Sequence, residues 1–340
     1  IKAPANAPNT DGVDPSGQHQ LIQYCNISTG DDNIAVKAGS AFCSDLTIAD
    51  CTFGTGHGVS IGGQSNRGLD GMLVKDCTFT GTTAGLRMKA DATQGGIVQN
   101  VKYTNLTMNN VQYPIEIYSY YKQVGNPGAT GGNTQTTPQK VNNYNATPPN
   151  SLASQTLPAW RNITIDNVKG TGMGYSVIWG LALDKYFIEN VTLHDVQITG
   201  AGVGIFDAGN VQFTGNTNLG KVTATNSVVI VEQPKSVSVA SGGEATFHAA
   251  AAGTSGVKGT AAQLQWMLDE KPLADGKQAD GSTASGATTD TLKISGVKSG
   301  GKVTLKVSNT LDSYDVEARK LVENKTGFSA VSEAAVLSVK

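Results

Sequence analysis

Over the first two thirds of the chain, apolar and polar residues alternate in short segments that are separated by turns rich in glycine and polar residues. The clearest of these segments span residues 34–37, 59–62, 86–89 and 115–118. An alternation with a period of two predicts β-strands with one buried face. Less regular segments follow at 162–165, 190–193, 204–206 and 211–213. The pattern favours a fold built from many short strands.

The strand pattern repeats at a constant length. The separation is 26 residues from Cys25 to Cys51 and again from Cys51 to Cys77. A period in this range is typical of solenoid proteins. We therefore predict that residues 1–226 form a parallel β-helix with coils about 4.8 Å apart. The three cysteines would form an internal ladder of small buried side chains, and spacing without a CxxC motif makes a zinc site improbable.

The character of the sequence changes near residue 227. Short alternating segments then lie at 229–234, 243–247, 264–266, 290–294 and 303–309. This spacing is typical of a β-sandwich and resembles a bacterial immunoglobulin-like domain. Trp266 would be the buried tryptophan of that domain, and no cysteine follows Cys77 to form its usual disulfide. We expect an all-β protein with an immunoglobulin-like sandwich at 227–340.

Composition and charge exclude several partners. Charged residues make up 15% of the chain and the net charge is −2, whereas an average globular protein has roughly 25% charged residues. A nearly neutral chain lacks the basic surface that nucleic acids require. No apolar segment is long enough to span a membrane. We expect a monomer that binds neither nucleic acid nor the membrane interior.

When the strands are aligned by their apolar residues, polar residues from distant parts of the sequence fall into columns. Arg87 and Lys89 project from the same outer face, because residues i and i+2 of a strand share a face. At the preceding turn, Asp32 lies in the column of His57. Counting back in the same way from the first coil places Asp11 in that column too. The sequence therefore predicts a cleft with acids at one end and cations at the other.

These residue types suit glycoside hydrolysis. Crowded carboxylates cannot all ionise freely, so we expect one of them to have a raised pKa and to act as a general acid beside a general base. An inverting glycosidase uses such a pair at a separation of roughly 6.5–9.5 Å. The two cations point to an anionic sugar. Each motif alone would commonly be a turn or a solvated surface, but their coincidence at the repeat spacing favours a functional site.

Four short segments, in order, carry a family resemblance. The segments are NTDGVD at 9–14, GDD at 30–32, GHG at 56–58 and RMK at 87–89. They resemble the signature segments of the polygalacturonases, the pectin-cleaving glycoside hydrolases of family 28, and the likeness covers about residues 1–225. It implies a right-handed β-helix that hydrolyses α-1,4 links between galacturonates with inversion, without metal or other cofactor. It also implies a secreted or periplasmic enzyme.

The resemblance also implies a role for each matching residue. Asp31 would be the general acid, Asp11 and Asp32 would hold and activate the water, and His57 would tune the protonation of the acid. The substrate-binding residues would be Asn9, Gly58, Arg87, Lys89 and Tyr121. Arg87 and Lys89 would bind a carboxylate of the substrate.

Two features depart from the family pattern. Asn33 stands where many members carry a cysteine, so a disulfide often made there would be missing. Residues 1–4 resemble a strand that lies deep inside a full-length enzyme, so we expect upstream coils and any signal peptide to be absent and the chain alone to be poorly stable or weakly active. The segment 122–158 is rich in Gly, Asn, Thr, Pro and Gln, which predicts a flexible excursion or a loop at the rim of the cleft.

Other functions stay open. A pectate lyase also uses a β-helix, but it needs Ca²⁺ and an arginine base, and the paired aspartates and GHG segment argue against it. A rhamnogalacturonan or xylogalacturonan hydrolase would keep the fold and change the substrate. A carbohydrate-binding β-helix fragment would bind the polysaccharide in the same cleft without hydrolysing it. Endo or exo action and the role of the sandwich are not determined by the residues.

Overall fold

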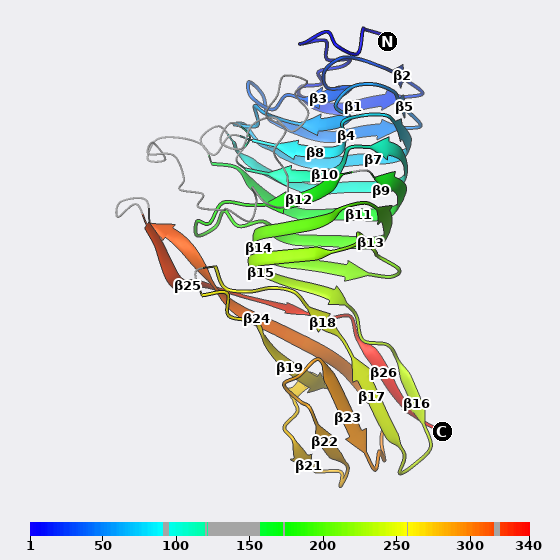
Figure 1. Cartoon of the computed structure of the whole chain (residues 1–340), viewed down its shortest axis with the longest axis vertical. Helices are drawn as coiled ribbons and strands as arrows, with labels where there is room; N and C mark the ends of the chain where they lie inside the picture. Colours follow the sequence, from blue (N-terminus) through cyan, green and yellow to red (C-terminus); the bar gives the residue numbers. More distant parts are fainter. Residues whose placement is uncertain (91–94, 120, 122–156, 173, 257, 316–319) are drawn as a thin grey trace.

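A computed structural model describes residues 1–340 except 91–94, 120, 122–156, 173, 257 and 316–319. Every element that it assigns within the described residues is a β-strand. Figure 1 shows a tall stack of strands in the N-terminal part and a smaller group of sheets at the C-terminal end. The predicted excursion at 122–158 lies almost wholly outside the described residues.

The N-terminal stack is a parallel β-helix, as predicted. One face consists of β1 (Gln18–Gln23), β4 (Cys43–Ala49), β7 (Leu69–Thr80), β9 (Ile97–Val111), β11 (Ala159–Gly172) and β13 (Glu189–Thr199). Another face consists of β3 (Ile34–Val36), β6 (Val59–Ile61), β8 (Ala84–Lys89), β10 (Tyr113–Tyr118), β12 (Tyr175–Trp179) and the start of β14 (Gly202–Thr214). Short strands β2 (Asn26–Ile27) and β5 (Thr52–Phe53) pair with each other, and β5 also pairs with β7. All these pairings are parallel.

The strand register agrees with the alignment of apolar residues. Ile34 pairs with Val59, Val59 with Leu86, and Leu86 with Ile115. All four side chains are buried in the interior of the coil, which satisfies the apolar face predicted by the period of two. The polar residues between them must therefore face outward, in columns that run across the coils.

The interior of the β-helix is a continuous apolar core. Cys25 and Cys51 precede residues that pair across coils, and Cys77 continues the same position in β7. Cys51 and Cys77 are buried, Cys25 is half-buried, and all are free thiols. The rings of Phe53 and Phe79 stack beside them with centroids 4.9 Å apart. Stacked rows of this kind stabilise each coil by about 1.5–3 kcal/mol per fully buried large side chain.

The C-terminal part contains two packed sheets. One sheet holds β16 (Val237–Val239), β26 (Ala335–Val339), β24 (Gly301–Asp315), β25 (Lys320–Val331), β19 (Gln263–Leu268) and β20 (Lys271–Pro272). The other holds β17 (Glu244–His248), β23 (Thr291–Ser295), β22 (Thr283–Ser285) and β21 (Gly276–Lys277). Trp266 is buried between them and its Nε1 donates to the Thr289 carbonyl at 2.8 Å. The sandwich architecture fits the prediction, and its assignment to the immunoglobulin-like domains stays a prediction.

The two parts are joined by an extended strand. β15 (Val222–Glu232) pairs with β14 and, in the antiparallel sense, with β18 (Ala250–Ala251). It therefore runs across the predicted boundary between residues 226 and 227, which itself stays a prediction. The Asn226 amide donates to Asp207 Oδ1 at 2.6 Å and to the Asp312 carbonyl at 2.9 Å. In the part of the chain that is described, no helix has the length and hydropathy needed to cross a membrane.

Candidate active site

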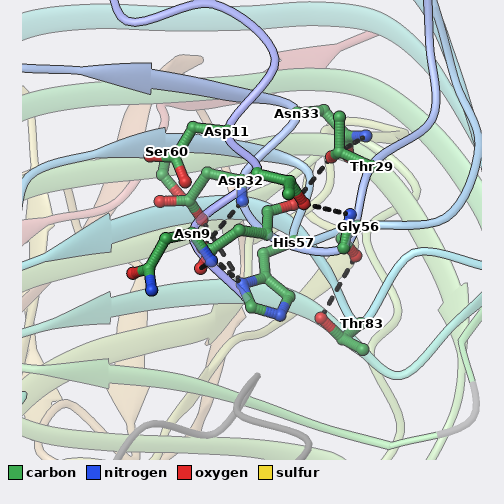
Figure 2. Close-up of polar contacts among 12 residues, drawn as sticks. Asn9, Asp11, Thr29, Asp32, Asn33, Gly56, His57, Ser60 and Thr83 are labelled. Carbon is green, nitrogen blue, oxygen red and sulfur yellow. Dashed lines mark hydrogen bonds and ion pairs between the residues drawn. The ribbon is translucent and has the colours of Figure 1, made fainter. Parts of the chain in front are cut away.

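Turns from successive coils bring the predicted residues together. Asp31 and Asp32 lie in the turn before β3, and His57 lies in the turn before β6. The Gly12 amide donates to the Asp32 carbonyl at 2.9 Å, and the His57 amide donates to the Asp31 carbonyl at 2.9 Å. These backbone bonds hold three coils in register, so the predicted column exists. Figure 2 shows Asn9, Asp11, Asp32 and His57 gathered at one place on the stack.

Asp32 is the buried centre of this cluster. Its Oδ1 accepts hydrogen bonds from Ser60 Oγ at 2.7 Å and Arg87 Nη1 at 3.1 Å, and its Oδ2 accepts one from Lys89 Nζ at 2.8 Å. Burial opposes ionisation of the carboxyl, but the charges of Lys89 and Arg87 outweigh it and hold the pKa of Asp32 below its ordinary value. Asp32 is therefore an anion whose oxygens are already occupied.

Asp31 lies beside it and is partly exposed. His57 Nδ1 is 3.2 Å from Asp31 Oδ1 and 3.7 Å from Asp32 Oδ1. Neither contact is aligned as a hydrogen bond, so both are electrostatic. The Asp32 amide donates to Asp31 Oδ1 at 2.9 Å and the Asn9 amide to Asp31 Oδ2 at 3.1 Å. The approach of His57, together with these amides, lowers the pKa of Asp31 despite its partial burial.

The crowding argument was therefore wrong for these two carboxylates. It predicted that one member of the aspartate cluster would have a raised pKa, whereas the pKa values of both Asp31 and Asp32 are lowered. The physical reason is that every nearby negative charge is matched by a donor or a cation. Side-chain contacts of this kind cannot be read from the strand period.

Asp11 occupies the outer side of the cluster. Its Oδ2 accepts a hydrogen bond from Lys37 Nζ at 3.1 Å, and Asp14 Oδ2 lies 3.9 Å from the same nitrogen. Burial opposes the charge on Lys37, but the bond to Asp11 and the charges of both carboxylates raise the pKa of the lysine. Lys37 was not predicted as a site residue. The sequence did place Lys37 beside Lys89 in the same column, and this position could have identified it as a site residue.

Arg87, Lys89 and Tyr121 come together as predicted. The Tyr121 ring centroid is 5.8 Å from Arg87 Cζ and 5.1 Å from Lys89 Nζ, within the range of cation–π attraction. The Arg87 side chain has 0% of its surface exposed and that of Lys89 has 6%. In this conformation both cations are bound to Asp32. Contact of either with a carboxylate of the substrate stays a prediction.

Glu116 joins the cluster without having been predicted. It pairs with Arg87 in the register of β10 and β8, and its Oε2 is 3.5 Å from Arg87 Nε. Complete burial raises the pKa of Glu116 to about 7, against the lowering effect of Arg87 and Lys89. The register would have placed Glu116 beside Arg87, but nothing in the strand pattern indicated that both side chains are buried.

Asn33 links the two turns that carry the acids and the imidazole. Its Nδ2 donates to the Thr55 carbonyl at 2.8 Å and the Ile27 carbonyl at 3.2 Å, and its Oδ1 accepts from the Gly58 amide at 2.8 Å. Gly58 has φ +71°, and a Cβ there would lie 2.2 Å from the Ala84 carbonyl oxygen. Many members of the family carry a cysteine at this position, and here the Asn33 amide connects the two turns instead.

A cation could approach only part of this cluster. Ligand atoms of Asp31, Asp32 and His57 all lie within 4.8 Å of one another, a spacing compatible with a metal ion. Arg87 and Lys89 already occupy the oxygens of Asp32, and their charges would repel a second cation. The donor set therefore fits acid–base chemistry better than metal binding.

Comparisons with known proteins give the same picture. Residues 1–147 match the family model of the glycosyl hydrolases family 28. An endo-polygalacturonase of Pectobacterium carotovorum subsp. carotovorum is 46% identical over 202 residues, which are 58% of this chain and 42% of that protein. An endo-polygalacturonase of Pectobacterium parmentieri is 36% identical over 202 residues, which are again 58% of this chain and 42% of that protein.

Among solved structures, a polygalacturonase from Erwinia carotovora ssp. carotovora is 32% identical, with a TM-score of 0.46, over 66% of this chain and 49% of that one. The chain spans 42% of the length of the two Pectobacterium relatives. The match to the family model includes all four signature segments, and the described geometry brings them together. Through this β-helical part, the chain is similar to the glycosyl hydrolases of family 28.

Proposed function

We propose that the chain hydrolyses α-1,4-galacturonosyl linkages in pectin or polygalacturonate with inversion. The observation that carries this proposal is the contact of Asp31 with His57 directly beside the Asp32–Lys89–Arg87 cluster. The names of the relatives, which are polygalacturonases, support the same substrate. We further propose that the protein acts as a monomer outside the cytoplasm, in the periplasm or after secretion.

Asp31 and His57 act together as the proton donor. The carboxylate and the imidazole lie close enough for a proton to pass between them. Without substrate Asp31 is ionised, in agreement with its lowered pKa. When a sugar displaces water, the loss of solvation favours the neutral form of the acid, and Asp31 can give the proton to the glycosidic oxygen.

Asp11 accepts the proton of the attacking water. Its Oδ2 has one partner, Lys37, and its side chain is 20% exposed, whereas both oxygens of Asp32 are occupied by Ser60 and the cations. Water attacks C1 from the face opposite the leaving oxygen as the C1–O bond breaks, and inversion results. Asp32 fixes the cations, and its Oδ2, which accepts a single hydrogen bond from Lys89, can accept a second one from the water.

The cation pair recognises the uronate. Lys89 is less completely buried than Arg87, and the Tyr121 ring lies over both. We infer that Lys89 and Tyr121 contact the sugar, while Arg87 acts through Asp32. Asn9 and Gly58 support the site through their backbone, Asn9 by its bond to Asp31 and Gly58 by its bond to Asn33.

Incubation of the purified chain with polygalacturonate tests the proposal. We expect new reducing ends and a first product with the inverted, β anomeric configuration by NMR. Products that absorb in the near ultraviolet and disappear on chelation would instead identify a lyase. Binding of oligogalacturonates without new reducing ends would identify a carbohydrate-binding β-helix, and cleavage of rhamnogalacturonan alone would change the substrate.

A further inference from the structure

Glu116 is a buried acid that the hydrolytic mechanism does not use. It lies in β10 and has 0% of its surface exposed. Neither of its carboxyl oxygens has a hydrogen-bond partner among the described residues. Its ionic contact there is with Arg87 Nε, at 3.5 Å from Oε2. A carboxyl group in this state is costly to bury and requires an explanation.

The column around Glu116 does not require an acid for packing. Ser60 pairs with Arg87 on one side, and Val177 pairs with Glu116 on the other. Both of these positions hold small or apolar side chains that are buried. An apolar residue at position 116 would avoid the cost of burying a carboxyl group, and the contact of Glu116 with Arg87 points to a role for the acid through its charge.

Glu116 completes a buried network of charges. The network contains two cations, Arg87 and Lys89, and one anion, Asp32, which bonds to both. Glu116 lies on the side of Arg87 opposite to the coil of Asp32, because β10 and β6 flank β8. With Glu116 protonated the network has a net charge of +1, and with Glu116 ionised its net charge is zero.

The groups that face Glu116 are few. β8 contributes Arg87 and Lys89, the turn before β3 contributes Asp32, and β10 itself contributes Tyr118. On the β12 side the register partner is the uncharged Val177. Burial raises the pKa of Glu116 to about 7, so the proton is exchanged near neutral pH.

We propose that Glu116 is a positioning residue for Arg87 whose proton sets the affinity of the cation pair for an anionic sugar. The protonated form leaves one positive charge uncompensated next to the Tyr121 ring, and the ionised form removes it. The identity of the ligand as a uronate rests on the proposed function. The dependence on the Glu116 proton does not require turnover.

Calorimetric binding of trigalacturonate between pH 6 and pH 8 tests this inference. We expect the affinity of the wild-type chain to fall by about tenfold over this range, as one nearby charge is neutralised. Glu116→Gln keeps the shape and removes the charge, so its affinity should stay near the wild-type value at pH 6. Glu116→Val introduces the residue that stands at position 177 of the same column, and its affinity should depend on pH in the same way as that of Glu116→Gln. It replaces Glu116→Gln in the experiment if the glutamine variant does not fold.

Glu333→Gln is the matched control, because it removes one exposed carboxylate far along the chain, in the C-terminal part. It should keep the wild-type pH dependence. His57 is present in all these proteins, so its contribution is the same on both sides of the comparison. Wild-type and Glu116→Gln curves that fall in parallel would overturn the inference and leave the proposed hydrolysis intact. Binding that follows the expected pattern without any cleavage would support the inference on Glu116 and overturn the proposed hydrolysis. A wild-type chain with no affinity for trigalacturonate at pH 6 would overturn both proposals.

Discussion

Lys89 donates a hydrogen bond of 2.8 Å to Asp32 although 57 residues separate them in the sequence. The contact crosses two coils of the β-helix and is almost completely shielded from water. A pair in such surroundings interacts far more strongly than an exposed ion pair. The signature segments are therefore held together by charge as well as by the strand register.

Replacement of Asp31 by asparagine should remove the transferable proton. We expect Asp31→Asn to lower kcat on polygalacturonate by a factor of about 10²–10⁴ and to leave oligogalacturonate binding largely unchanged. Reducing-end assays and calorimetry measure the two effects. Asp50→Asn, at an exposed turn residue, is the control and should be fully active. An active Asp31→Asn would disprove the assignment of the acid.

Replacement of Asp32 by asparagine should destabilise the fold. The change leaves Arg87 and Lys89 buried without their common anion, and removal of one partner of a buried pair typically costs about 3–5 kcal/mol. Urea unfolding measures this loss. Asp45→Asn, at a carboxylate on the surface beside His19, should cost about 1 kcal/mol or less. Equal stabilities of the two variants would show that the cluster contributes little.

Stability should depend on pH through Glu116. Its folded-state pKa of about 7 lies above the ordinary value of 4.5, so ionisation favours the unfolded chain. The contribution is fully present below pH 4.5 and is lost as the pH rises through 7, and the total amounts to about 3 kcal/mol. Glu116→Gln should therefore gain stability over the wild type between pH 5 and pH 8 in denaturant unfolding. Glu333→Gln should show no such gain in stability. If Glu116→Gln differed from the wild type by the same free energy of unfolding at pH 5 and at pH 8, the raised pKa of Glu116 would be contradicted.

Asn33 should matter for both stability and turnover. Asn33→Ala removes the amide that joins the Thr55 carbonyl and the Gly58 amide, and we expect a loss of about 2–3 kcal/mol because buried groups are left unpaired. Loss of the link also frees the turn of His57, so kcat should fall more than the affinity. Asn109→Ala, at an exposed position of β9, should change stability by less than about 1 kcal/mol.

The coil register could be predicted from the sequence because parallel pairing forces equivalent residues into rows. Ile34, Val59, Leu86 and Ile115 align for this reason, and the acids in front of them follow. The partners of the charged groups could not be predicted in the same way. Whether Arg87 meets a substrate or Asp32 depends on side-chain conformation and burial, and the period of two carries no information about either.

The same limit applies to Glu116 and to the pKa of Asp31. Both follow from contacts within about 4 Å that involve three coils at once. The sequence alone also predicted a change of domain near residue 227, and this boundary stays a prediction, because β15 passes through that point as one strand.

The junction at β15 has a mechanical consequence. The pairing of β15 with β18 and the bonds from Asn226 to Asp207 and Asp312 tie the stack to the sandwich. The chain ends far from its start, at the tip of the sandwich (Figure 1). A particle or surface attached at that end would hold the candidate site at a set angle and distance. The access of this site to an insoluble polymer would then depend on rotation of the whole protein about its point of attachment. Diffusion on a flexible linker would contribute little.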